Sequence, residues 1–288
     1  MSIDKLQEKI RKRKNPSVID FDVLPEHIPP YLMEEEGTFV KAYGRFCLEI
    51  MEGLQQIVPA VRFHFSTFAL LGGEGLSLLT YLLNRAKDCG YYVLLDSVEV
   101  LSADAAKAAC QALMQLPCDA VVLCSYIGSD GLKPYIKEIK NSGRAVFAVL
   151  RTANKSAPEL QDLMTGSRLV YMAAADILNR LGEPLIGRCG YSEVAGIGPA
   201  SSADSLRSLR GKYKRMFLMA EGYDYANANA KNCSFAFDTL GHGACVCAGS
   251  TVTAAWFHEN LDSTEYVTAA VAAAERMKKN LTRYVSVL

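Results

Sequence analysis

Residues 91–116, YYVLLDSVEVLSADAAKAACQALMQL, contain the two kinds of element that recur along the whole chain. Residues 91–96 form a short apolar run that predicts a buried β-strand ending in a carboxylate. Residues 103–116 have the apolar spacing of an amphipathic helix, with Ser102 as the expected N-cap and Asp104 in the first turn. This stretch therefore predicts one strand–helix unit.

The same alternation recurs from one end of the chain to the other. Helical patterns such as residues 75–86 and 157–164 separate the apolar runs. The eight strand candidates are residues 17–22, 60–65, 91–96, 120–125, 145–150, 184–187, 215–220 and 244–248. Eight such units without a composition break predict one closed (β/α)8 TIM barrel. An open doubly wound sheet is the alternative, but it usually has fewer strands and a glycine-rich first turn.

Composition and charge limit the kinds of partner. The chain has 288 residues, half of them hydrophobic, which is enough for one large domain. We expect a single domain over residues 1–288, with a helical extension at 1–15 and a C-terminal helix at 260–288. The formal net charge is zero, so we expect neither nucleic acid nor a membrane as a partner. No apolar run approaches the roughly 18 residues of a spanning helix, and the charged N-terminus does not resemble a secretory signal.

The cysteines indicate a reducing compartment. There are nine, an odd number for paired disulfides, and several lie in apolar runs, where a free thiol behaves as a small hydrophobe. Cys245 and Cys247 share one face of a predicted strand, but no further ligand stands nearby, so we expect no metal there. A cytoplasmic location follows as the expectation.

Candidate site residues lie at the strand ends, where parallel barrels carry their chemistry. The first predicted strand ends at Asp22, which either binds a sugar hydroxyl or forms a turn. Arg62 and His64 alternate onto one face of the second strand. A cation inside a barrel needs an anion, and Asp96 is the expected partner of Arg62. Arg62 and Asp96 either act in catalysis or merely neutralise each other's charge.

The loop after the eighth predicted strand is a candidate phosphate site. It reads Ala248-Gly249-Ser250-Thr251, and barrels commonly bind phosphate there through backbone N–H groups. Ser250 is therefore a candidate ligand-binding residue. Small residues also suit close packing of a helix on the barrel, so both interpretations stand.

Four stretches resemble the orotidine 5'-phosphate decarboxylases, in particular their bacterial branch. Residues 68–76, FALLGGEGL, are a loose version of F-F-E-x-x-G-x-x-G-L, and Asp96 follows its strand like the first Asp of D-A-K-R-G-D. Residues 125–134, SYIGSDGLKP, resemble P-Y-L-G-x-D-S-L-x-P. Residues 151–154 and 159–163, RTAN and ELQDL, resemble R-T-S-N-P-G…E-L-Q-D-L. Order and spacing match from about Ser17 to Trp256.

The resemblance implies a homodimeric barrel that removes carbon dioxide from C6 of orotidine 5'-monophosphate, giving UMP, with no cofactor. It implies an alternating Lys-Asp-Lys-Asp array, whose last Asp comes from the partner subunit. That array disfavours the substrate carboxylate and favours the developing carbanion, which the second Lys protonates. A Gln and an Arg hold the phosphate far from the reacting bond and supply binding energy there.

Transferred to this sequence, the pattern keeps two of its acidic positions and loses or alters six other functional positions. The ribose-binding Asp corresponds to Asp22, the first Asp of the array to Asp96, and the first Lys to Arg62, which keeps the charge but not the shape. Thr152 and Asn154 match the motif after the fifth strand and are expected to bind ligand. The altered positions are Val98 for the second Lys, Leu101 for the partner's Asp, Ala153 for the pyrimidine-contacting Ser, and Ala226 and Ser250 for the phosphate-holding Gln and Arg.

These losses predict an impaired or inactive decarboxylase, because a valine at position 98 cannot donate a proton. Glu99 and His64 are the conceivable substitute acids, but Glu99 would lie beside Asp96, where like charges oppose anion binding. One interpretation is a decarboxylase with displaced machinery. A second is a barrel that binds a nucleotide-like molecule or regulates an active paralogue. A third is another lyase, whose metal form would need Glu99 as the second carboxylate. The dispersed losses favour the second interpretation.

Overall fold

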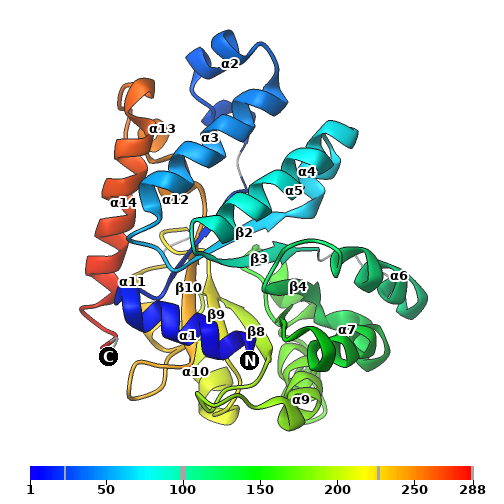
Figure 1. Cartoon of the computed structure of the whole chain (residues 1–288). Helices are drawn as coiled ribbons and strands as arrows, with labels where there is room; N and C mark the ends of the chain where they lie inside the picture. The colour runs from blue at the N-terminus through cyan, green and yellow to red at the C-terminus, as the bar shows by residue number, and fades with distance from the viewer. Residues whose placement is uncertain (23, 98–101, 226–227, 287–288) are drawn as a thin grey trace.

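Eight parallel strands close into a barrel in the computed structural model, which describes residues 1–22, 24–97, 102–225 and 228–286. Their order around the barrel is β1-β10-β9-β8-β5-β4-β3-β2, with helices outside the sheet (Figure 1). The strands are β1 Ser17–Asp20, β2 Ala60–His64, β3 Tyr92–Asp96, β4 Ala120–Cys124, β5 Ala145–Val149, β8 Val194–Pro199, β9 Leu218–Glu221 and β10 Ala244–Ala248. The predicted (β/α)8 barrel is confirmed.

Helices follow the strands in the predicted alternation. They are α1 Ser2–Arg13, α2 Pro30–Glu36, α3 Phe39–Leu54, α4 Phe65–Ala69, α5 Gly72–Asp88, α6 Ala103–Leu113, α7 Gly128–Ser142, α8 Ala157–Leu160, α9 Val170–Gly182, α10 Ala203–Lys212, α11 Ala230–Ser234, α12 Ser250–Thr253, α13 Ala255–His258 and α14 Tyr266–Leu281. The Ser102 side chain accepts a hydrogen bond from the Ala105 backbone N–H at the start of α6, as its prediction as an N-cap required. No helix in the described part of the chain is both long and apolar enough to cross a bilayer.

The prediction of the sixth barrel strand at residues 184–187 is wrong. Residues Glu183–Leu185 form a 3-10 helix, and the strand is β8, further along the chain. Its sequence, VAGIGP, is rich in glycine and ends in proline, so it resembles a loop. The glycines are required by packing: a Cβ on Gly196 would lie 2.6 Å from Leu150 Cδ1.

Two further boundaries differ from the expectation. The helix predicted at residues 157–164 is only one turn, because the chain then enters a short antiparallel pair, β6 Met164–Thr165 and β7 Arg168–Leu169. The first strand ends at Asp20 rather than Asp22. The second difference matters for the site, because it changes which aspartate lies inside the barrel.

Helix α1 closes the N-terminal end of the barrel. Its buried residues Ile3, Leu6 and Ile10 belong to the same apolar cluster as the inward-facing side chains of the strands. The buried Glu193 carboxylate, at the start of β8, accepts hydrogen bonds from the backbone N–H groups of Ser2 and Ile3. Helix α1 therefore covers the N-terminal end of the barrel with both apolar and hydrogen-bonded contacts.

Candidate functional site

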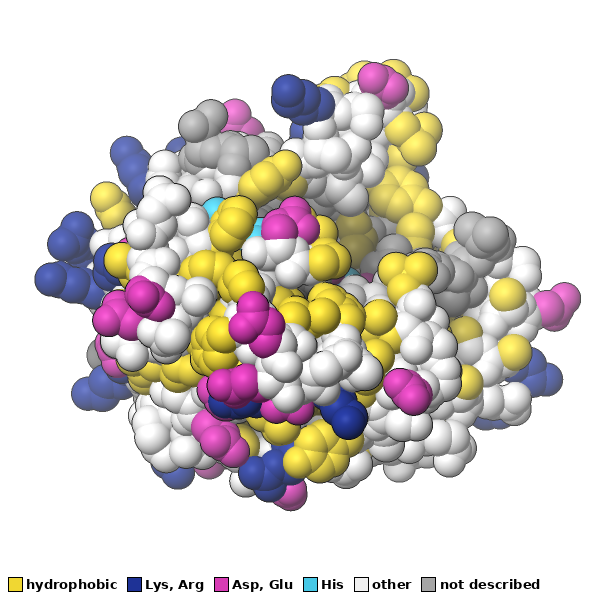
Figure 2. Space-filling model, turned by 90° about the horizontal axis from the view of Figure 1, so that it is seen from above, with side chains coloured by type: hydrophobic (Ala, Val, Ile, Leu, Met, Phe, Trp, Pro, Cys, Tyr) yellow, Lys and Arg dark blue, Asp and Glu magenta, His cyan; other side chains and the backbone are white. Residues whose placement is uncertain are grey.

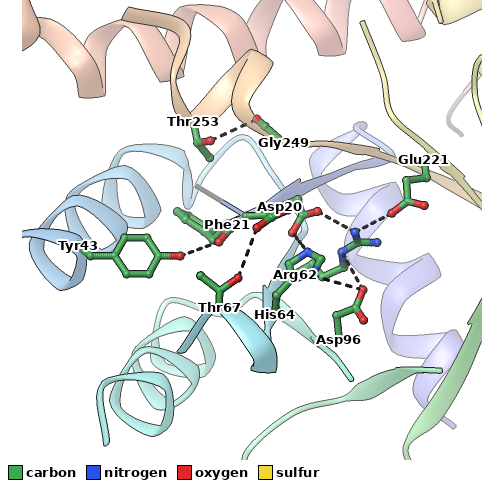
Figure 3. Close-up of polar contacts among 11 residues, drawn as sticks. Asp20, Phe21, Tyr43, Arg62, His64, Thr67, Asp96, Glu221, Gly249 and Thr253 are labelled. Carbon is green, nitrogen blue, oxygen red and sulfur yellow. Dashed lines mark hydrogen bonds and ion pairs between the residues drawn. The ribbon is translucent and has the colours of Figure 1, made fainter. Parts of the chain in front are cut away.

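Five charged side chains meet at the C-terminal end of the barrel: Asp20 from β1, Arg62 and His64 from β2, Asp96 from β3 and Glu221 from β9 (Figure 3). They converge because side chains alternate along a strand and neighbouring strands are in register. Asp20 pairs with Arg62 and His64 pairs with Asp96 across the ladder. We call these five residues the mouth cluster.

Asp20 makes a short contact with each of the two cations. Its Oδ2 lies 2.8 Å from Arg62 Nη2, and its Oδ1 accepts a hydrogen bond from His64 Nε2 at 2.8 Å. Asp96 contacts the same cations more loosely, with Oδ2 3.6 Å from Arg62 Nε and 3.7 Å from His64 Nδ1. Glu221 Oε1 lies 2.6 Å from Arg62 Nη2. Two cations and two aspartates thus alternate in a closed ring, with Glu221 as a third carboxylate outside it.

Burial and mutual charge set the protonation of the mouth cluster. Burial raises the pKa of Asp96 to about 6, because its contacts with Arg62 and His64 only partly offset the loss of solvation. Burial would lower the pKa of His64, but the charge of Asp20 outweighs it and raises that pKa to about 9. Burial would raise the pKa of Asp20, yet Arg62 and His64 hold it below its ordinary value. At neutral pH the ring therefore holds two cations, Arg62 and His64, with an ionised Asp20 and a largely ionised Asp96.

The outer faces of the same strands hold the cluster in place. Phe21, next to Asp20, stacks on Phe63 of β2 with ring centroids 5.0 Å apart. Tyr43 of α3 donates a hydrogen bond to the Phe21 carbonyl at 2.7 Å. These contacts fix the backbone of β1 and β2 at the level of Asp20 and Arg62, so the ring geometry is supported by the core.

Asp22, predicted to bind ligand, lies outside the mouth cluster. It follows the end of β1 and is exposed, and its only described side-chain hydrogen bond is a long one from Thr67 Oγ1, at 3.4 Å. Because side chains alternate along β1, the side chain of Asp20 points into the barrel, two residues before the predicted end of the strand. Of the two aspartates, Asp20 and not Asp22 therefore contacts Arg62 and His64.

Thr152 and Asn154 are bonded within their own loop after β5. The Thr152 backbone N–H donates to Gln161 Oε1 at 2.8 Å, and the Thr152 hydroxyl donates to Asn154. Arg151 at the start of this loop makes two hydrogen bonds of 2.8 Å to Asp162. Among the described residues, the polar side-chain contacts of Thr152 and Asn154 stay within this loop, so the structure does not join them to the mouth cluster.

Ser250 begins the short helix α12 and is half-buried. The residue before it, Gly249, approaches the cluster closely: a Cβ there would lie 3.9 Å from Asp20 Cβ. The Gly249 carbonyl accepts a hydrogen bond from Thr253 Oγ1 at 3.3 Å. The last barrel loop thus passes directly beside Asp20. The remaining predicted positions, Val98, Glu99, Leu101 and Ala226, lie outside the described residues.

Sequence reasoning missed two members of the mouth cluster, Asp20 and Glu221. Both are the last residue of their strand, in phase with the inward-facing positions below them. Extending the predicted strand at residues 215–220 by one position would have found Glu221. Asp20 was passed over because the predicted strand ran two residues too far.

The expectation that only Glu99 can supply a second carboxylate near Asp96 is wrong. Asp20 and Glu221 both reach the same cation as Asp96. The Arg62 guanidinium lies among the three carboxylates, where a metal ion would otherwise be attracted. The described residues contain no group of His, Cys, Asp or Glu arranged to hold a metal ion.

Curated proteins with similar sequences share one name. No family model matches the chain. An orotidine 5'-phosphate decarboxylase of Petrotoga mobilis is 28% identical over 240 residues, covering 81% of this chain and 82% of the relative. One of Clostridium kluyveri is 27% identical over 265 residues, covering 90% and 89%. Over most of its length the chain is therefore similar to curated orotidine 5'-phosphate decarboxylases.

Solved structures of similar proteins agree with the fold. The orotidine 5'-phosphate decarboxylase family is represented by an OMP decarboxylase of Leishmania donovani, which superposes with a TM-score of 0.76 at 21% identity and covers 98% of each chain. A UMP synthase of the same organism matches with a TM-score of 0.78 at 21% identity, covering 98% of this chain and 56% of the other. At these identities the matches show the shared barrel.

Proposed function

We propose that this chain is a member of the orotidine 5'-phosphate decarboxylase family that does not decarboxylate orotidine 5'-monophosphate and binds a nucleotide-like small molecule without turning it over. The observation that supports this proposal is the closed ring of the mouth cluster. Arg62 stands where the resemblance places the first Lys, and Asp20 and Glu221 bind its guanidinium. Its charge is therefore directed at protein carboxylates rather than at a substrate.

The charge balance of the mouth cluster opposes the family's substrate. Orotidine 5'-monophosphate carries a carboxylate and a phosphate, both anionic, and the cluster already has more carboxylates than cations. An additional buried anion without a cation to pair with is strongly disfavoured. The position that the resemblance gives to the phosphate-holding Arg is Ser250, which has no charge to offer.

His64 is a poor replacement for the lost proton donor. Each of its two ring nitrogens faces a carboxylate, Nε2 toward Asp20 at 2.8 Å and Nδ1 toward Asp96 at 3.7 Å. Donation to a ligand carbon would require His64 to leave Asp20, its closest partner. The raised pKa, about 9, also makes the imidazolium a weaker acid than an unperturbed His.

The proposal extends to the partner and the compartment. Exposed large apolar side chains stand on the loops after β1, β2, β5 and β9, namely Leu24, Leu70, Leu160, Leu163, Met164 and Tyr225. Seen from above, hydrophobic side chains gather over the middle of the face, with Lys and Arg mainly near its edge (Figure 2). Such surfaces favour association, so we propose a homodimer or a mixed dimer with an active paralogue. Nine free thiols support a cytoplasmic location.

The test is a turnover assay on the purified full chain. We expect no UMP from orotidine 5'-monophosphate at protein concentrations equal to that of the substrate, while an active homologue in the same buffer converts it completely. UMP formation that rises in proportion to the protein and disappears in Asp96→Asn would contradict the proposal. Thermal shifts with nucleosides and nucleotides then test binding, and co-purification with an active paralogue tests the mixed dimer.

A further inference from the structure

We propose that Asp20 determines the charge of the ligand admitted to the mouth cluster, excluding nucleoside monophosphates and other anions in favour of neutral, hydroxyl-bearing ligands such as a pyrimidine nucleoside. This inference rests on the proposed function, because it concerns a site that binds without turnover. It assigns a specificity role to a residue that no feature of the family resemblance singles out.

Asp20 is suited to this role because it alone in the mouth cluster makes a short contact with both cations. The Arg62 and His64 contacts are each 2.8 Å, through different carboxylate oxygens. Asp96 reaches the same two cations only at 3.6 and 3.7 Å. Neutralising Asp20 therefore removes a short ionic contact from both cations at once and leaves Arg62 with Glu221, whereas neutralising Asp96 removes a short contact from neither.

The guanidinium of Arg62 has unused capacity to bind an acceptor. Its side chain is only 5% exposed, and among the described residues Nη1 is a buried donor with no hydrogen-bond partner. An unpartnered donor in a buried position is costly and therefore indicates a group that a ligand or water can satisfy. With Asp20 ionised, an entering anion meets a guanidinium whose charge is already neutralised.

The ligand meets the cluster at its two more exposed members. The side chains of His64 and Glu221 are 17% and 28% exposed, against 11% for Asp20. Carboxylate oxygens accept hydrogen bonds and cannot donate them when ionised, so Glu221 and the exposed Asp22 match the hydroxyl groups of a sugar. A phosphate brought to the same position would face carboxylates on both β1 and β9, which disfavours it.

The experiment compares uridine with UMP by calorimetry at pH 7.5 and constant ionic strength. For the unmodified chain we expect uridine to bind more tightly than UMP. For Asp20→Asn we expect the affinity for UMP relative to uridine to rise about tenfold, the effect of removing one unit charge within several ångströms of the ligand phosphate in a partly solvated site. Glu26→Gln is the matched control, because it removes an exposed charge from the loop after the same strand and is expected to change the ratio less than about twofold.

The proposal is wrong if Asp20→Asn binds UMP no more tightly than the unmodified chain, including the case in which neither binds it, or if Glu26→Gln gives the same change. Should Asp20→Asn fail to fold, Glu221→Gln provides the second variant, because it also removes a carboxylate from Arg62 and its side chain is more exposed. It must shift the ratio in the same direction. Turnover of orotidine 5'-monophosphate by the unmodified chain contradicts the proposed function instead, so the two failures are distinguishable.

Discussion

His64 Nε2 lies 2.8 Å from Asp20 Oδ1, across the first two strands of the barrel. The contact joins a residue named as a candidate from the sequence to one that was not. It explains why His64 is a cation rather than an acid–base group near neutrality, since the charge of Asp20 outweighs the burial of the ring. The protonation state of His64 therefore depends on Asp20.

Asp20→Asn should lower the pKa of His64 from about 9 toward or below its ordinary value. The physical reason is that burial alone favours the neutral imidazole. A titration of the His64 ring resonances by NMR measures this change, and Glu26→Gln should leave the pKa near 9. A His64 pKa that stays near 9 in Asp20→Asn would show that Asp96 and not Asp20 keeps His64 protonated.

Asp96→Asn should stabilise the fold at neutral pH and have less effect in acid. Because the folded-state pKa of Asp96 is about 6, above its unfolded value of 3.8, its contribution to stability is full below about pH 4 and is lost as the pH rises through 6. The variant avoids that loss, so its free energy of unfolding should exceed that of the unmodified chain by about 1–3 kcal/mol at pH 7.5. Urea denaturation at pH 4.5 and 7.5 measures the difference, and a gap independent of pH would refute the explanation.

Glu193→Ala should release helix α1 from the N-terminal end of the barrel. The substitution leaves the backbone N–H groups of Ser2 and Ile3 without their buried acceptor, which costs about 1–3 kcal/mol. Amide hydrogen exchange should accelerate in α1 first. Glu183→Ala, at an exposed position before β8, is the control. Unchanged exchange in α1 would mean that its apolar face alone keeps it in place.

Two glycines of α5 should respond oppositely to alanine. A Cβ on Gly75 would lie 2.1 Å from the Phe68 carbonyl oxygen, whereas a Cβ on Gly73 would contact nothing within 4 Å. Gly75→Ala should therefore destabilise the fold by about 1–3 kcal/mol through overpacking. Gly73→Ala should be neutral or stabilise it by about 0.4–1 kcal/mol, because alanine has less freedom in the unfolded chain. Thermal denaturation of both variants decides between them, and equal losses would exclude the close approach of α4 to α5.

The fold was predictable where hydrophobic alternation was strong and not where packing required small residues. Apolar runs identified most strands, and the inward alternation of Arg62 and His64 correctly placed both beside Asp96. The β8 strand was missed because Gly196 and Gly198 interrupt its hydrophobic pattern. A larger side chain at Gly196 would collide with Leu150, and no local sequence pattern reveals that contact.

The kinds of residue in the site could be predicted from the sequence, but how far into the barrel each one lies could not. Asp20 and Asp22 both fit the inward alternation of the first strand, so the sequence alone does not show which of them belongs to the mouth cluster. Glu221 comes from a strand far away in the sequence, and its contact with Arg62 depends on barrel closure. Such long-range contacts follow from the arrangement of strands rather than from any one stretch of sequence.

Helix α1 has a consequence for every group in the mouth cluster. Because its apolar face packs against the inward-facing side chains at the N-terminal end, we expect protons and water to exchange between the buried charges and bulk solvent through the C-terminal end of the barrel. Whatever covers that end, a small molecule or a second barrel, then slows exchange for all five side chains together. The titration rate of His64 would thus report occupancy of the C-terminal end, without any label attached to the ligand itself.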